Sequence, residues 1–540
     1  MLCNSCKKEF DYFPGEKKVY QDRRIPLPEF CPICRQKRRL AFRNENNLYY
    51  GKSFLSNKKI ISLYSHDSPF KVIDHEEWWG DDFDATIYGR DFDFSRPFFD
   101  QFNELQREVP RWNRIFINCE NSEYTNNCEN CKNSYMLFSS TDSEDCYYST
   151  RLNKSNNCIS CLRGMSSQYC SDCRSCHLCY DIHYSQVSLN CSNSYFLYDC
   201  QSCTDCIMCS GLRNKKYYIL NKKYSKEDYE KYKEGFLRKI KVDINSFKAK
   251  FAELVKTAPI QSLLLVSVEN CTGDYMGKSK NVVNGYNVVY NEDCINVYTC
   301  TKAKNCYDCF SLDHSELCLE CDTSYELYDC LFCTYTVKLK NCRYCGQCVS
   351  LNNCFGCVGL KKKDYYILNK KYSKEEYFEL LEKIEEHMKR TGEWGKPFPL
   401  SFSTFPYNKS MAQEDCPLTK EKAEDLNLMW EDEEEIVSPK EVYEMPEDPD
   451  ETICDKVLVC EKSGKPYKII PQEYRFYKKF NLPFPKLCPD ERYKELFKTQ
   501  NKTVLNPVKC KNCNLSIQTT YDSPEEYNIF CEKCFLETAY

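Results

Sequence analysis

Small and apolar side chains recur at every third position between residues 119 and 209, where every cysteine shares one frame with serine, leucine and isoleucine. A period of three over such a long stretch predicts a chain wound into regular coils that aim one residue in three inward. The bulky residues of the frame, and a run of its cysteines, are spaced by multiples of fifteen. They are Leu137, Leu152, Ile182, Leu197 and Leu212, with Cys131, Cys146, Cys161, Cys176, Cys191 and Cys206. We therefore predict a tight β-solenoid with about fifteen residues per coil and a cysteine ladder.

The residue before the inward position supports this winding. Asn or Asp directly precedes many of the cysteines, as at Asn127, Asn130 and Asp145. Both residue types tolerate a left-handed backbone and cap their own turns, so we expect corners there. A coil with about five inward residues has no room for large side chains, which explains the heavy use of cysteine as a small apolar residue.

A second array of the same kind follows. Its cysteines, from Cys294 to Cys357, keep a common frame of three, and both arrays end in nearly the same sequence. Residues 217–229 read YYILNKKYSKEDY and residues 365–377 read YYILNKKYSKEEY, an offset of 148. YYIL is typical of a last strand, and Ser225 or Ser373 begins a capping-box pattern that predicts a helix. Such a helix would cover the open end of the array.

A second duplication brackets the arrays, at a constant offset of 457 residues. It aligns Cys3, Cys6, Cys31 and Cys34 with Cys460, Ser463, Cys488 and Glu491, and Ser53, Ser56, Asp74 and Glu77 with Cys510, Cys513, Cys531 and Cys534. Each end of the sequence therefore carries a pair of related modules. We number them terminal modules 1 (residues 1–48), 2 (49–115), 3 (458–505) and 4 (506–540).

Modules 1 and 4 each hold two CxxC pairs about twenty residues apart, which is the ligand set of a tetrahedral structural zinc site. We expect two Zn²⁺ ions, bound by Cys3, Cys6, Cys31 and Cys34 and by Cys510, Cys513, Cys531 and Cys534. Module 2 lacks thiolates, and we expect packing alone to hold it. In module 3, loss of the site is the simpler interpretation. The alternative is a three-ligand site with an open, catalytic position on Cys460, Cys488 and Glu491.

The flanking segments also carry a resemblance. CNSCKKEF, PLPEFCPICRQKRRLAFRNE, CKNCNLSIQTTY and FCEKCF are similar to the probable zinc-ribbon domains of uncharacterised bacterial cysteine-rich proteins. The segments EEWWGDDFDATIYGRDFDFSRPFFDQF and PYNKSMAQEDCPLTKEKA extend this similarity over most of the chain. The resemblance implies zinc binding and a multidomain scaffold, and it brings no established reaction or substrate.

The predicted architecture is mainly β with helical caps. Between the zinc-ribbon modules we place the first solenoid at 116–224, a helical cap and linker at 225–258 and the second solenoid at 259–372. A helical cap and connector (373–429) and an acidic linker (430–457) follow.

Composition indicates the cellular compartment of the protein and the redox state of its cysteines. The 540 residues hold 41 cysteines and a net charge of −5, with no secretory signal in MLCNSCKKEF and no apolar run that could span a membrane. We therefore expect a cytoplasmic, reducing location, where the array cysteines are buried thiols and the CxxC pairs inside the arrays follow from the period of three. Oxidised ladders and a column of thiolates that collects soft metal ions are the alternatives.

The function that these patterns favour is a non-catalytic scaffold that binds a protein partner. No P-loop, dinucleotide fingerprint or nucleophile elbow is present, and we expect the scattered histidines on the surface, so an enzyme is unsupported. A first alternative is association with RNA or DNA. The basic residues Arg35, Lys37, Arg38, Arg39 and Arg43 follow the last ligand of module 1, although a solvated helix face is the favoured interpretation. A second alternative is a thiol-rich metal store or redox protein.

Overall fold

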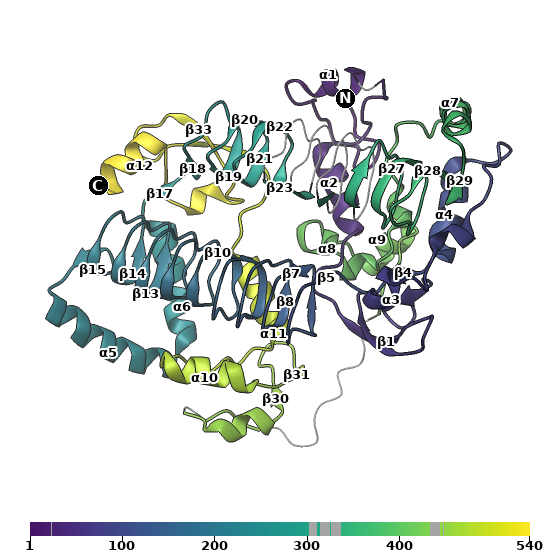
Figure 1. Ribbon diagram of the computed structural model, residues 1–540. Helices are drawn as coiled ribbons and strands as arrows, with labels where there is room; N and C mark the ends of the chain where they lie inside the picture. Colours follow the sequence, from purple (N-terminus) through teal and green to yellow (C-terminus); the bar gives the residue numbers. More distant parts are fainter. Residues whose placement is uncertain are drawn as a thin grey trace. The chain divides into compact units, whose positions relative to one another are not determined.

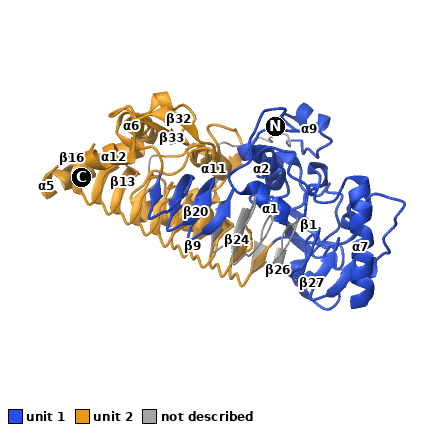
Figure 2. Ribbon diagram, turned by 90° about the horizontal axis from the view of Figure 1, so that it is seen from above, with its two compact units in different colours: residues 1–114, 264–432 blue, residues 115–263, 433–540 orange. Residues whose placement is uncertain are grey.

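The computed structural model describes residues 1–22, 24–301, 310–313, 324–325, 336–432, 443–446 and 448–539 (Figure 1). These residues are mainly β, with many short strands and fewer helices. They divide into two compact units, which Figure 2 colours separately. Unit 1 comprises residues 1–114 and 264–432, and unit 2 comprises residues 115–263 and 433–540. The second array thus belongs with modules 1 and 2, and the first array with modules 3 and 4, a pairing that the order along the chain does not predict.

The first array is built from parallel strands whose register advances by twelve residues. Tyr180 pairs with Ser192, for example, and Ser192 pairs with Thr204. The predicted coil of fifteen residues is therefore wrong. Its strands are β5 (Phe116–Ile117), β6 (Thr125–Asn126), β7 (Cys128–Glu129), β8 (Tyr135–Phe138), β9 (Tyr147–Asn153), β10 (Leu162–Met165), β11 (Gln168–Ser171), β12 (Tyr180–His183), β13 (Ser192–Tyr198), β14 (Thr204–Ser210) and β15 (Lys216–Ile219).

The spacing of fifteen has a physical origin in this twelve-residue coil. A step of fifteen is one coil plus one side of three residues, so successive bulky side chains lie on different sides of the coil. A small residue then lies directly over each bulky one. Gly164 lies over Leu152, and a Cβ atom at Gly164 would be only 2.9 Å from the Leu152 Cδ2 atom. Cysteines fifteen residues apart are likewise diagonal neighbours, and the predicted ladder is not a column.

The corners of the coil are where the sequence predicts them. Every third residue from Asn127 to Leu220 has a positive φ, and each directly precedes an inward position. Asn and Asp take this backbone readily, but Met136 and Phe196 also adopt it. The inward residues between the corners form a buried core of cysteine, leucine and isoleucine, interspersed with buried serines such as Ser140 and Ser185.

The second array has the same twelve-residue register, as between Val337 and Val349 or Gly273 and Gly285. Its inward frame is buried at Val282, Cys294 and Cys345. Its strands are β18 (Leu265–Val266), β19 (Gly273–Gly277), β20 (Lys280–Val283), β21 (Gly285–Val289), β22 (Glu292–Ile295), β23 (Tyr298–Thr301), β24 (Phe310–Asp313), β25 (Ser324–Tyr325), β26 (Thr336–Lys340), β27 (Val349–Phe355) and β28 (Asp364–Ile367). The predicted inward residues Cys306, Cys309, Cys318, Cys321, Leu327, Cys330 and Cys333 lie outside the described residues.

Each array ends as predicted, in a last parallel strand followed by a helix. A short antiparallel strand follows the last parallel one, β16 (Lys222–Lys223) after β15 and β29 (Lys370–Lys371) after β28. Ser225 then caps α5 (Lys226–Val242), and Ser373 forms a capping box with Glu376 at the start of α7 (Lys374–Thr391). Helix α6 (Ile244–Thr257) completes the segment between the arrays.

The four terminal modules share a plan, in which two short antiparallel segments joined by a tight turn precede a helix. The paired segments are the bridge Leu2–Glu9 in module 1, β1 (Tyr49–Lys52) with β2 (Lys59–Ser62), β30 (Leu458–Val459) with β31 (Pro466–Tyr467), and β32 (Asn506–Lys509) with β33 (Ser516–Thr519). The helices are α2 (Pro32–Ala41), α3 (His75–Trp79), α11 (Pro489–Phe497) and α12 (Glu532–Ala539). Modules 1 and 3 add α1 (Glu16–Asp22) and α10 (Pro471–Lys479).

The remaining elements connect these parts. In the described part of the chain they are β3 (Val72–Ile73), α4 (Phe98–Glu108), β4 (Arg111–Trp112), α8 (Ala412–Asp415), α9 (Lys420–Asp425), β17 (Ile260–Gln261), β34 (Ile529–Phe530) and several short 3₁₀ turns. Among the described helices, none combines the length and the apolar composition that crossing a membrane requires.

Candidate metal centres

The four cysteines of module 1 converge between a tight turn and the start of a helix. Cys3 and Cys6 lie in the turn, where Lys7 has a positive φ and its amide donates to the Cys3 carbonyl at 3.0 Å. Cys31 is the N-cap residue of α2, and Cys34 lies in its first turn. The Cys31 amide donates to the Cys3 sulfur at 3.2 Å. The N-terminal end of a helix favours negative charge, so this setting favours thiolates.

Module 4 repeats this arrangement at the other end of the sequence. Asn514 has the positive φ of the turn, and its amide donates to the Cys510 carbonyl at 2.9 Å. Cys531 directly precedes α12, and its amide donates to the Cys510 sulfur at 3.3 Å. The two tetrads are therefore the same local structure built twice.

The sulfur positions fit a tetrahedral metal ion. In each tetrad the four Sγ atoms lie within 4.8 Å of one another. Cys6 and Cys31 are 3.7 Å apart at sulfur, and Cys513 and Cys531 are 3.8 Å apart. A tetrahedron with metal–sulfur bonds of about 2.3 Å has edges of about 3.8 Å. Each tetrad can thus hold one metal ion with four sulfur ligands and no open position.

Hydrogen bonding prepares one thiol of each tetrad to ionise. Burial acts to raise the pKa of Cys3, but N–H groups of Cys31, Cys6 and Ser5 that point at the sulfur lower it to about 6. In module 4, burial likewise acts to raise the pKa of Cys510, but backbone N–H groups that point at its sulfur lower it to about 6. Metal ligands must be deprotonated thiols, so these bonds favour binding.

Module 2 replaces the metal position with a hydrogen-bond network. Ser53 donates a short hydrogen bond to the Glu77 carboxylate, and the Asp74 amide donates to the Ser53 hydroxyl at 3.3 Å and to Glu77 at 3.3 Å. Asn57 supplies the positive φ of the turn. The prediction that packing alone holds this module is wrong, because Ser53, Glu77 and the Asp74 amide are joined by hydrogen bonds.

Module 3 does not assemble the alternative three-ligand site. The Glu491 carboxylate lies 2.8 Å from the Lys494 ammonium and 3.4 Å from that of Lys462. The Cys488 sulfur faces the Ser463 hydroxyl at 3.7 Å. Within the described part of the chain, three or more potential ligands converge at the two cysteine tetrads and not around Cys460.

The basic residues after the module 1 tetrad do not form the expected solvated face. Arg35, Arg38, Arg39 and Arg43 are buried, and Lys37 is half-buried with its ammonium over the Tyr407 ring at 5.6 Å. Arg35 pairs with Glu16 at 2.7 Å, and Arg43 pairs with Glu45 at 2.7 Å. These arginines hold module 1 together, and nucleic-acid binding through them stays a prediction.

The array cysteines act as hydrogen-bond donors in a dry core. Cys173 donates to the carbonyl of Ser171 at 3.1 Å and to that of Ile182 at 3.4 Å, and these offsets of two and nine residues recur in both arrays. Burial raises the pKa of Cys173 and of Cys200 well above the usual value of a thiol. Cys173 and Cys200 are therefore protonated packing groups and poor metal ligands. By contrast, hydrogen bonds from the Cys342 and Cys357 thiols lower the pKa of Cys354 to about 6.

Two histidines that the sequence places on the surface are buried. Both ring nitrogens of His183 are hydrogen-bonded, one with the Ser171 hydroxyl at 2.8 Å and the other with the Asp181 carboxylate at 2.9 Å. The rings of Phe476 and Phe480 cover it. His387 is buried beside the Arg96 carbonyl. The covering helix of module 3 lies far along the chain, so no local pattern near His183 signals its burial.

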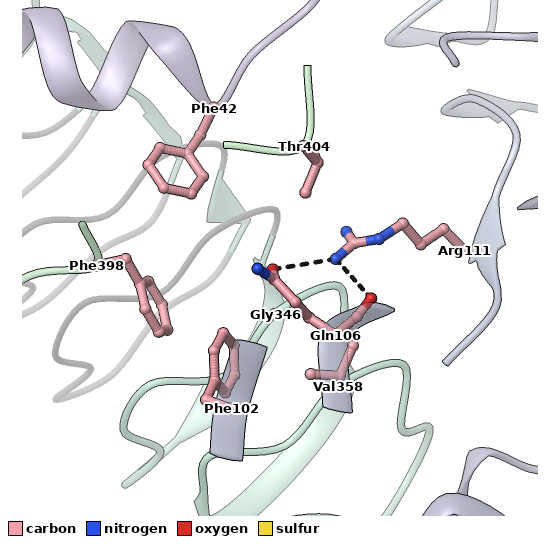
Figure 3. Close-up of a pocket in the computed structure, with 8 residues that line it drawn as sticks. All are labelled: Phe42, Phe102, Gln106, Arg111, Gly346, Val358, Phe398 and Thr404. Carbon is pink, nitrogen blue, oxygen red and sulfur yellow. Dashed lines mark hydrogen bonds between the residues drawn. The ribbon is translucent and has the colours of Figure 1, made fainter. Parts of the chain in front are cut away.

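Two cavities among the described residues differ widely in volume. Figure 3 shows an apolar cavity of about 10 Å³ in unit 1, where Arg111 donates to the carbonyl and side-chain oxygens of Gln106, both at 3.2 Å. Its volume suits a single water molecule. A larger cavity of about 470 Å³ in unit 2 is bordered by Lys486 and Lys462, which pair with Glu461 and Glu495.

Comparison with known proteins gives no relative from which a role could be transferred. No protein-family model, no curated protein and no solved structure matches this chain. The similarity to zinc-ribbon domains noted from the sequence therefore stays a prediction, and the site must be interpreted from its own geometry.

Proposed function

We propose that this protein is a non-catalytic, zinc-binding scaffold whose two arrays are β-solenoids that present rigid surfaces to a protein partner. The observation that carries the proposal is the equivalence of the Cys510 tetrad with the Ser53–Glu77 network. The same turn and helix are held by four cysteines in one module and by hydrogen bonds in the other. A position that either four cysteines or a hydrogen-bond network can occupy serves folding, because neither arrangement leaves an open coordination site for a reaction.

Zinc is the metal that this ligand set favours. Four thiolates in a closed tetrahedron are the commonest environment of structural Zn²⁺, and small modules of this size depend on the metal for folding. Such thiolates persist in a reducing compartment, so we place the protein in the cytoplasm.

The arrays suit a binding role by their outward side chains. Tyr135 is 37% exposed and Tyr180 is 50% exposed on the first array. Exposed aromatic side chains on a rigid surface are enriched at protein interfaces. Association with nucleic acid would need basic side chains other than the buried arginines of α2, and a metal store would need array thiols that give up their hydrogen bonds.

The proposal is tested by zinc analysis of matched variants purified without added metal. The wild-type protein should carry two zinc ions per chain. Cys6→Ser and Cys513→Ser should each carry one, whereas Ser56→Ala, at the position equivalent to Cys513, should keep two. Metal well beyond two ions in the wild type would favour the store, and retention of both ions by Cys513→Ser would contradict the assigned site.

A further inference from the structure

Module 4 holds the segment through which the chain leaves unit 2 for the second array. The boundary between the units lies after Leu263. Directly before it, β17 pairs in parallel with β34 of module 4, with Ile260 beside Ile529. The Ile260 amide donates to the Asn528 carbonyl at 3.1 Å, and the Ser262 amide donates to the Phe530 carbonyl at 3.0 Å. The Asn528 amide donates back to the Lys256 carbonyl at 3.0 Å.

Module 2 holds a second of the three passages between the units in the same way. That boundary lies after Arg114. Directly before it, β4 pairs in parallel with β3 of module 2, with Val72 beside Arg111. The Arg111 amide donates to the Lys71 carbonyl at 2.8 Å, and the Asn113 amide donates to the Ile73 carbonyl at 2.9 Å. The offset of 457 aligns Val72 with Ile529, so the two clamps use the same strand of equivalent modules.

The two clamps differ in what anchors that strand. After β34 comes Cys531, a member of the module 4 tetrad, whose amide donates to the Cys510 sulfur. After β3 comes Asp74, whose amide donates to Ser53 and Glu77. Both clamps share one bond, from the Lys511 amide to the Ile529 carbonyl at 3.0 Å and from the equivalent Phe54 amide to the Val72 carbonyl at 2.7 Å. Strand β34 is therefore tied to the tetrad through the Ile529 carbonyl and through Cys531, the residue that follows the strand.

We propose that the module 4 tetrad makes one clamp metal-dependent, whereas the module 2 clamp holds without metal. The inference rests on the proposed zinc binding and adds a consequence to it. Loss of the ion leaves the four cysteines without the metal that they share as ligands. Strand β34 then loses its anchor and releases residues 256–262. The Ser53–Glu77 network contains no metal and keeps residues 111–113 in place. Removal of the ion by a chelator would then free the passage held by module 4 and leave the passage held by module 2 in place.

The test is hydrogen exchange followed by mass spectrometry on the full chain, with zinc content measured on the same samples. The wild-type protein is compared with the Cys513→Ser variant and with Ser56→Ala. In Cys513→Ser, which should lose one zinc, we expect exchange in peptides covering 256–262 and 528–530 to rise at least tenfold. Peptides covering 71–73 and 111–113 should be unchanged. Ser56→Ala should leave residues 256–262 protected.

Each outcome tests a different part of the proposal: the zinc site, the clamp or the asymmetry between the two clamps. Loss of one zinc with unchanged exchange at 256–262 would overturn the clamp and leave the zinc site standing. A similar rise at 111–113 would overturn the asymmetry, because it would indicate general loosening. Wild-type protein without zinc would overturn both the site and the clamp. Exchange measured before and after brief chelation of the wild type, with zinc added back, covers the case in which Cys513→Ser fails to fold.

Discussion

The Arg213 guanidinium lies over the Phe535 ring, 5.1 Å from its centre, and joins the last coils of the first array to module 4. In the other unit the Lys361 ammonium lies over the Trp78 ring at 5.2 Å. The array offset of 148 aligns Arg213 with Lys361, and the module offset of 457 aligns Phe535 with Trp78. The second module of each pair therefore docks on its array through the same cation–π contact, although the chain pairs each array with the more distant modules.

Replacement of Lys361 by methionine should destabilise unit 1. Its ammonium contacts the Trp78 ring and donates to the Gly80 carbonyl at 3.0 Å, and the loss should cost about 1–2 kcal/mol of unfolding free energy. Urea unfolding followed by tryptophan fluorescence measures this change. All the tryptophans lie in residues assigned to unit 1, so the signal reports on that unit. The matched variant Arg213→Met should leave this transition in place, and an equal shift in both variants would contradict the division into units.

The twelve-residue coil predicts a specific clash at Gly164. A leucine there would meet the Leu152 side chain, so Gly164→Leu should destabilise the first array by about 1–3 kcal/mol. Leu152→Ala in the same chain should relieve part of this cost, with a coupling of at least about 0.5 kcal/mol. Hydrogen exchange of peptides in the first array measures the four members of this cycle. Strictly additive effects would indicate that the two positions are not stacked.

Module 2 should lose stability in acid through Glu77. Burial acts to raise the pKa of Glu77, but hydrogen bonds from Ser53, Ser56 and the Asp74 amide lower it below its ordinary value. A carboxylate whose pKa is lowered in the folded state stabilises the fold above its unfolded pKa, and this stability is lost as pH falls through the folded pKa. Exchange at residues 71–73 should therefore rise below about pH 4.5. Glu77→Gln should weaken this pH dependence, and an unchanged profile would exclude Glu77 as its source.

The buried pair of Arg492 and Glu473 should be needed for module 3. The two side chains meet at 2.7 Å, and Arg492 also donates to Ser160 of the first array at 3.0 Å. Removal of one partner leaves a buried charge, so Glu473→Ala should cost about 3–5 kcal/mol. The exposed pair of Lys486 and Glu461 provides the control, since Lys486→Ala should cost less than about 1 kcal/mol. Protease protection of module 3 measures both variants, and equal effects would contradict the role of the buried pair.

The sequence predicts the local features of this fold well. The frame of three identifies the inward residues, and Asn127 or Asp145 before them marks the corners, because a positive φ restricts which residues are tolerated. The capping residues Ser225 and Ser373 begin the helices that they predict. The two cysteine tetrads follow from spacing alone, because their ligands are close in sequence.

Features that depend on distant contacts escape the sequence. The coil length cannot be read from the sequence, because the fifteen residues between Leu137 and Leu152 combine one coil of twelve residues with one side of three. The burial of His183 under Phe480, and the pairing of each array with its modules, depend on segments hundreds of residues apart. In module 2, Ser53 and Glu77 show the loss of ligands, but only the folded chain shows that they bind each other.

We propose that the two tetrads hold zinc while the array cysteines remain buried thiols. Native mass spectrometry of protein purified without added metal or reductant, combined with a thiol count before and after denaturation, tests it directly. We predict two zinc ions per chain, with most array thiols free but unreactive until the protein unfolds. Many more metal ions, or array cysteines that are mostly oxidised, would contradict the account and make the arrays themselves the site of the chemistry.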